Sequence, residues 1–88
     1  MPSSEYIDTP RLKTLVEAGA INYVSVRGVP GGFVVVVKVG MSERTVRAQK
    51  RTNPRVFSTM DGIVGYCTSA GIRRLDVDLA GHSKAALF

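Results

Sequence analysis

Residues 33–39, FVVVVKV, decide the fold. Valine fills five of the seven positions, and its branched Cβ favours the extended backbone of a β-strand. A strand this uniformly apolar is typical of the middle of a sheet, where one face is covered and the other is at least partly shielded. The stretch therefore predicts a central strand, and the neighbouring segments are interpreted from it.

A strand is predicted on each side of this central run. Residues 23–27, YVSVR, alternate between apolar and polar side chains, which is typical of a strand with one buried face. The glycine- and proline-rich residues 28–32 predict a hairpin turn, and residues 40–42 predict a second turn. Residues 43–49 then alternate again, so three antiparallel strands are expected.

A short helix is predicted before the strands. Asp8 or Thr9 can cap its N-terminus, and Pro10 suits its first turn. Leucine and valine follow at helical spacing, and Gly19 is the expected stop. Residues 1–8 are polar and without period, so a flexible N-terminus is expected.

A second helix is predicted at about residues 59–70, after the capping pattern S-T-M-D at 58–61. Its apolar stripe consists of Met60, Ile63, Val64, Cys67 and Ala70. Gly62 and Gly65 weaken a helix, and close approach to the sheet is the expected reason for them. Gly71 is expected to end this helix.

Residues 73–79 alternate once more and predict a last strand, whose inward side chains are Leu75, Val77 and Leu79. The fold class expected is α+β: a three-stranded antiparallel sheet with helices packed on it, in the order α-β-β-β-α-β, with a fourth strand at the C-terminus. Residues 9–79 would form a single domain, and residues 80–88 would form a C-terminal tail.

The composition limits the class of protein. With 88 residues, 44% of them hydrophobic and 22% charged, the chain is expected to be one ordinary globular domain. A single cysteine excludes an internal disulfide. No apolar run is long enough for a membrane span and the first residues lack a signal-peptide pattern, so a cytoplasmic protein without a membrane partner is expected.

An enzyme is not expected, because the residues that could carry chemistry are isolated. His82 is the only histidine, and Cys67 lies on the apolar stripe of the second helix, where free cysteine acts as a small hydrophobic residue. Asp76 and Asp78 share one strand face, which is typical of a solvated sheet edge. The glycines of residues 28–32 lack the context of a phosphate-binding loop. No cofactor, metal or small-molecule substrate is therefore expected.

Positive charge is concentrated in the middle of the chain. Twelve Lys and Arg against seven Asp and Glu give a net charge of +5, and residues 18–42 and 44–60 contain no acidic residue. Alternation predicts a face opposite the helices made of Tyr23, Ser25, Arg27, Val34, Val36, Lys38, Thr45, Arg47, Gln49 and Arg51. With the cations of the adjoining turns, the candidate nucleic-acid-binding residues are Arg27, Lys38, Arg44, Arg47, Gln49, Lys50, Arg51 and Arg55.

Such a face has the chemistry of a β-sheet reader of duplex DNA. Guanidinium groups bind phosphates or the guanine edge, glutamine pairs with adenine, and valine or threonine methyl groups meet the thymine methyl. A lopsided positive field also raises encounter rates with polyanions. The leading hypothesis is therefore a small basic DNA-binding or DNA-segregation module whose partner is duplex DNA.

Other interpretations stay open. Polar residues alternate outward on every one-sided sheet, so the face alone does not require a nucleic acid. The main alternative is a protein-interaction or homodimerisation adaptor that uses exposed strand edges or Val34 and Val36, unless the first helix covers these valines. Double-stranded RNA binding also fits the order of elements, but the second helix carries no Lys or Arg before Arg73.

Two resemblances add to these hypotheses. Residues 23–70, three strands and a helix that starts F-S-T at 57–59, resemble the AP2-like arm-binding domains of tyrosine recombinases, which insert a three-stranded sheet into the major groove. Residues 15–79 resemble the ParC family of small partition-associated proteins of bacterial plasmids and integrative elements. The matching residues are Arg55, Phe57, Ser58, Gly71, Ile72, Leu75, Val77 and Asp78. This resemblance implies an accessory role in plasmid maintenance, with a partition ATPase and centromere DNA as partners.

Overall fold

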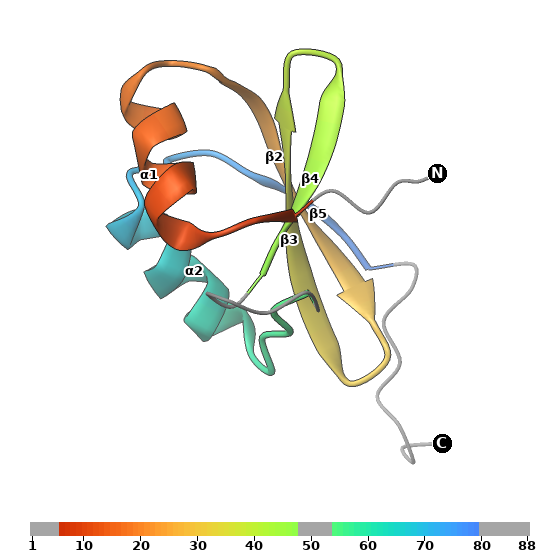
Figure 1. Ribbon diagram of the computed structural model, residues 1–88. Helices are drawn as coiled ribbons and strands as arrows, with labels where there is room; N and C mark the ends of the chain where they lie inside the picture. The colour runs from red at the N-terminus through yellow and green to blue at the C-terminus, as the bar shows by residue number, and fades with distance from the viewer. Residues whose placement is uncertain (1–5, 48–53, 80–88) are drawn as a thin grey trace.

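The chain forms a mixed β-sheet with two helices on one of its faces (Figure 1). The computed structural model describes residues 6–47 and 54–79. In these residues the elements are β1 (Tyr6–Ile7), α1 (Thr9–Glu17), β2 (Ile21–Val29), β3 (Gly32–Val39), β4 (Ser42–Val46), α2 (Met60–Ser69) and β5 (Asp76–Asp78). Neither of these two helices has the length and apolar character that a membrane crossing requires.

The sheet has five strands in the order β1-β4-β3-β2-β5. β3 pairs antiparallel with β2 on one side and with β4 on the other, so the valine-rich run is the central strand, as predicted. β1 pairs parallel with β4, and β5 pairs parallel with β2. The antiparallel centre is thus built from consecutive hairpins, and the two outer strands come from the two ends of the described chain.

The predicted three-stranded antiparallel sheet in the order α-β-β-β-α-β was wrong, because the sheet is mixed and has five strands. The missed strand, β1, has two residues, too few for any periodic pattern, and it lies in the segment expected to be flexible. Ile7 is nevertheless 2% exposed and belongs to the core. Parallel pairing requires a crossover from a distant segment, which no local sequence signal reports.

The last strand is shorter than predicted and covers Asp76–Asp78 only. It forms the outermost strand of the sheet, beside the middle of β2. Of the side chains predicted to face inward, Leu75 is half-buried, but Val77 and Leu79 are exposed. An edge strand has a neighbour on one side only, so its apolar side chains are less covered than those of β3.

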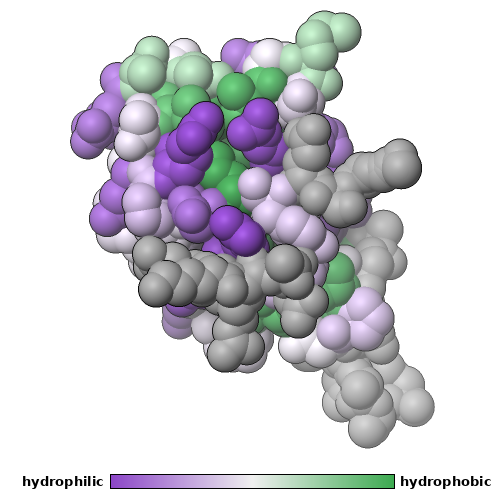
Figure 2. All heavy atoms as spheres, in the orientation of Figure 1, coloured by the Kyte–Doolittle hydropathy of each residue, from purple (hydrophilic) through white to green (hydrophobic). Residues whose placement is uncertain are grey.

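The core lies between the sheet and the helices, and Figure 2 shows apolar atoms between the polar side chains of the viewed face. Its strand residues alternate as predicted, since Val35 and Val37 of β3 are fully buried and pair with Val26 and Val24 of β2. The helices contribute Leu12, Ile63, Cys67 and Ala70. Val34 and Val36 point to the opposite side of the sheet, and because both helices lie on the core side, α1 does not cover these valines (Figure 1).

Both helices begin and end close to the predicted positions. Asp8 is the N-cap of α1, where its carboxylate accepts a hydrogen bond from the Arg11 backbone N–H at 3.2 Å. Thr59 caps α2 in the same way, and its hydroxyl accepts from the Gly62 N–H at 3.1 Å. After α2, Gly71 has a φ of 89°, a left-handed conformation that glycine adopts without strain.

Phe57 connects the second helix to the centre of the sheet. Its backbone N–H and C=O both bond to Phe33 of β3, at 2.8 and 2.9 Å. Its ring packs against Tyr66 of α2 with 5.2 Å between the ring centroids. The Tyr66 hydroxyl in turn forms a 2.8 Å hydrogen bond with the Thr9 hydroxyl of α1. One residue therefore links β3 to α2, and α2 to α1.

The close approach at Phe57 explains a glycine in β3, whereas the prediction for a glycine in α2 was wrong. A Cβ on Gly32 would collide with the Phe57 carbonyl oxygen and come within 2.8 Å of a Val56 methyl. Gly65, in contrast, has open space at this position, with nothing within 4 Å. The contact of Phe57 with β3 therefore requires glycine at position 32, whereas the packing of α2 does not require glycine at position 65.

We predict that Gly32→Ala destabilises the protein by about 1–3 kcal/mol, because the new methyl group separates Phe57 from β3. The matched control, Gly65→Ala, is expected to stabilise it by about 1 kcal/mol, since alanine is the better helix former and meets no atom there. Denaturant unfolding of both variants measures the two effects. Equal unfolding midpoints would contradict this account of Gly32.

Candidate functional site

The side of the sheet without helices, here called the outer face, carries a mixed set of side chains. Strand register places on it Tyr6, Tyr23, Ser25, Arg27, Val34, Val36, Lys38, Glu43, Thr45, Asp76 and Asp78. The residues predicted for this face from β2 and β3 are thus where alternation puts them, and so is Thr45 of β4. The acidic residues of β4 and β5 share the face with them.

Arg27 and Lys38 are the two candidate cations that lie within the strands of the outer face. The Arg27 Nη2 atom is 3.3 Å from both carboxylate oxygens of Glu43. Arg27 pairs with Val34 on one side of β3, and Glu43 pairs with Lys38 on its other side, so the ion pair crosses β3 over Val36. This position helps explain why Val36 is only 5% exposed on a face without helices.

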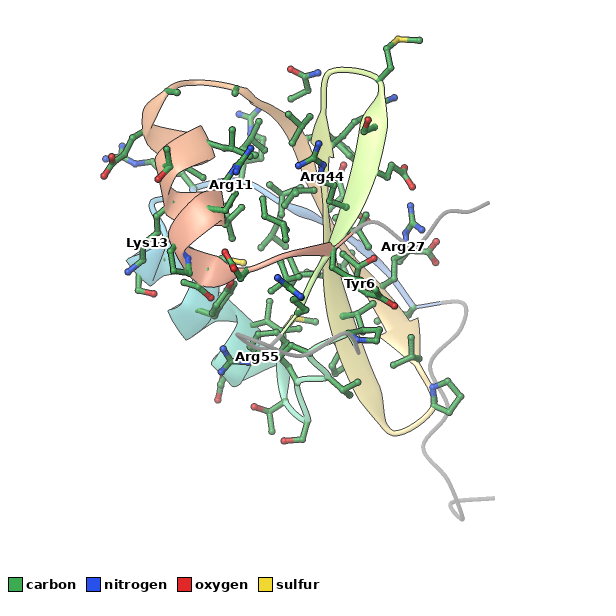
Figure 3. All side chains as sticks on the ribbon, in the orientation of Figure 1. Tyr6, Arg11, Lys13, Arg27, Arg44 and Arg55 are labelled. Carbon is green, nitrogen blue, oxygen red and sulfur yellow. The ribbon has the colours of Figure 1, made fainter. Side chains whose placement is uncertain are left out.

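Two other candidate cations, Arg44 and Arg55, lie on the helix side. Arg44 pairs with the fully buried Val37, so its side chain leaves β4 toward the helices. The Arg55 guanidinium lies over the rings of Phe57 and Tyr66, at 4.7 and 5.1 Å from their centroids. Figure 3 shows Arg44 and Arg55 on the side of the sheet away from Arg27.

The remaining candidates do not extend the outer face within the described chain. Arg47, just after β4, has a guanidinium nitrogen 3.7 Å from the Asp8 carboxylate. Gln49, Lys50 and Arg51 lie outside the described residues. The eight candidates are therefore divided: two on the outer face, two on the helix side, one at the β1–β4 edge and three outside the described residues.

The strand β5 adds negative charge to the outer face. Asp76 pairs with Ser25, and Asp78 pairs with Arg27. The Tyr23 hydroxyl donates a hydrogen bond to the Asp76 carboxylate, and this bond raises the pKa of Tyr23. With Glu43, three carboxylates thus accompany Arg27 and Lys38 on the described strands of this face. Alternation predicted that Asp76 and Asp78 point outward, but only the pairing of β5 with β2 places them beside Tyr23 and Arg27.

A groove of about 280 Å³ lies beside the first half of β2 and is called here the β2 groove. The residues that follow α2 form its other wall. Its apolar lining residues are Val16, Ile21, Val24, Ile72 and Leu75. Its polar lining residues include Tyr23, Arg73, Arg74 and Asp76. One local signal for this site is present in the sequence, the pair of arginines between Ile72 and Leu75, but residues 73–79 were interpreted only as a strand.

The described residues include one cysteine and no cluster of metal-ligand side chains. Cys67 is buried, and burial raises the pKa of its thiol, which disfavours a thiolate nucleophile. Within residues 6–47 and 54–79, His, Cys, Asp and Glu side chains form no group of three that could hold a metal ion. His82 lies outside these ranges.

The described residues form a small α+β protein with a mixed five-stranded sheet, an outer face without helices and a groove beside β2. The family model described as ParC-like matches residues 7–84, which is most of the chain. The chain belongs to the ParC-like family. Neither a curated protein nor a solved structure matches it. The predicted resemblance to ParC proteins is confirmed, and it fits, in general terms, a role in partition or maintenance.

We predict that Asp76→Asn lowers the pKa of Tyr23 toward its ordinary value of 10.0, because an amide oxygen accepts a weaker hydrogen bond from the phenol than a carboxylate does and because the variant removes the negative charge that favours the protonated phenol. The raised pKa also stabilises the folded state below pH 10, and this contribution is lost as pH rises through the folded pKa. Absorbance titration of phenolate, with Tyr23→Phe as the reference, measures the change. Asp78→Asn is the matched control and should have the smaller effect; equal effects would disprove a specific role of Asp76.

Proposed function

We propose that this protein is an accessory protein of DNA partition or maintenance that acts as a protein-interaction adaptor. Its family supports the general role. One observation carries the adaptor assignment: on the outer face, the guanidinium group of Arg27 is held by Glu43 above the central strand. On the face that alternation singled out for DNA, Arg27 is therefore paired with a carboxylate, and Asp76 and Asp78 add further negative charge.

Duplex DNA would bind this face at a cost. A β-sheet reader uses several cations for phosphates and base edges. Here Arg27 would have to leave Glu43, and the phosphates would approach Asp76 and Asp78. Protein interfaces, by contrast, are enriched in arginine and aromatic side chains and are bordered by polar groups of both signs. Tyr6, Tyr23 and Arg27 give the outer face this character.

The partner that we propose is the partition ATPase of the same plasmid or element, as the family resemblance implies. A second copy of this chain is a poorer partner at the outer edge of β5. In an antiparallel pair of two β5 strands centred on Val77, Asp76 of one copy would face Asp78 of the other. Like charges directly opposite each other are destabilising, so β5 is protected against pairing with itself.

Parallel titrations test the proposed function. The labelled protein is titrated with the purified partition ATPase and with random-sequence duplex DNA, each at several salt concentrations. Saturable binding to the ATPase and weak binding to DNA are expected. Binding to DNA through several phosphates would instead show a log–log salt slope of about −0.9 per contact.

Two double variants locate any DNA contact. Arg27→Gln with Lys38→Gln removes the cations of the outer face, and Arg11→Gln with Lys13→Gln removes two exposed cations of α1 on the helix side (Figure 3). The adaptor proposal predicts that each double variant lowers the weak affinity for DNA only slightly. The decrease should be no larger than the loss of two positive charges causes in a nonspecific electrostatic interaction. Tight DNA binding that either pair abolishes, with no binding to the ATPase, would refute the adaptor assignment.

A further inference from the structure

Residues of the hydrophobic core and residues packed against it line the β2 groove. Val24 belongs to the core, and four other lining residues are partly buried and pack against it: Val16, Ile21, Ile72 and Leu75. The volume of about 280 Å³ lies just below the roughly 300–1,000 Å³ typical of sites for whole small ligands. The groove is therefore suited to one or two aliphatic side chains of a partner.

The first residues of β2, beside the groove, have no neighbouring strand on the side of β5 in the described sheet. β5 pairs with Ser25, Val26 and Arg27 only, whereas β2 already begins at Ile21. In the described chain, no strand pairs with residues 21–24 on this side. An extended segment laid along the start of β2 would therefore meet a strand edge, the arrangement used when a peptide adds a strand to a sheet.

The charges at the groove favour an acidic segment. Arg73 and Arg74 both line it and are exposed. One carboxylate, Asp76, lines the groove as well, so the two guanidinium groups leave it with an excess of positive charge. A carboxylate of a bound segment would form charge-assisted hydrogen bonds with a guanidinium group, which are about twice as strong as neutral ones.

We propose that the β2 groove binds an extended acidic segment of a partner protein, with its aliphatic side chains on the apolar floor and its carboxylates at Arg73 and Arg74. This inference rests on the proposed adaptor function and names the chemistry of the segment recognised. Leucine or isoleucine next to glutamate or aspartate is the composition that fits both parts of the groove. A basic segment would meet two like charges.

A blocked nine-residue peptide of alternating leucine and glutamate is the probe. It is titrated into isotope-labelled protein, and the backbone amide signals are followed by NMR. The largest shifts are expected at residues 21–24 and 71–76. Two control peptides, one with lysine for each glutamate and one with alanine for each leucine, should bind at least about tenfold more weakly, since each lacks one of the two contacts.

Arg73→Glu with Arg74→Glu should weaken binding of the acidic peptide by at least about tenfold. Both side chains are exposed, so the variant is expected to fold, and its unfolding midpoint checks this. Arg11→Glu with Lys13→Glu on α1 is the matched control with the same change in charge, and it should bind as the parent does. Equal affinity for the acidic and basic peptides, or amide shifts outside the groove, would overturn the proposal.

Binding measurements with the partition ATPase distinguish a failure of the groove proposal from a failure of the proposed adaptor function. If the ATPase binds the parent protein and the Arg73→Glu, Arg74→Glu variant equally well, the groove proposal fails and the adaptor function stands. If the acidic peptide occupies the groove but the ATPase does not bind the parent, the groove proposal stands and the proposed partner is wrong.

Discussion

The pairing of β3 with a strand on each side is the constraint on which the rest of this structure depends. Val35 and Val37 lose all contact with solvent because β2 and β4 flank them and the helices cover them. The backbone of β3 is also the anchor for Phe57, which holds α2 through Tyr66. A change that displaces β3 would therefore affect both layers of the molecule at once.

The outer face shows how such a sheet can stay covered without a second layer of helices. Val34 and Val36 are 8% and 5% exposed, and the ion pair of Arg27 with Glu43 spans the strand that carries them. Exposed ion pairs contribute little to stability, about 0–1 kcal/mol. The ion pair matters here because it engages the guanidinium group of Arg27. A guanidinium group that faces a carboxylate across the sheet is a poorer ligand for phosphate than an unpaired one.

Much of the fold follows from local sequence. The central strand, its two hairpin neighbours, the cap at Asp8 and the alternation of β2, β3 and β4 were predicted, since each depends on residues within a few positions of one another. The capping pattern at 58–61 predicted the start of α2 to within one residue, because the N-cap is Thr59 rather than Ser58. Arg44 lies two residues before Val46, so the alternation of β4 places both side chains on the helix side. The prediction missed this because it assigned Arg44 to a turn. The candidate site was less predictable, because its charges come from strands far apart in the chain.

By itself, the sequence determined the antiparallel centre, the two helices and the core-facing sides of β2, β3 and β4, because hydrophobic period and turn chemistry act over short distances. Only the tertiary structure decided that β1 and β5 join the sheet in parallel, since parallel strands meet through long crossovers. That pairing brings Asp76 beside Tyr23, and hairpin register brings Glu43 within reach of Arg27. A chain with a net charge of +5 thereby folds into a sheet whose open face is not uniformly positive.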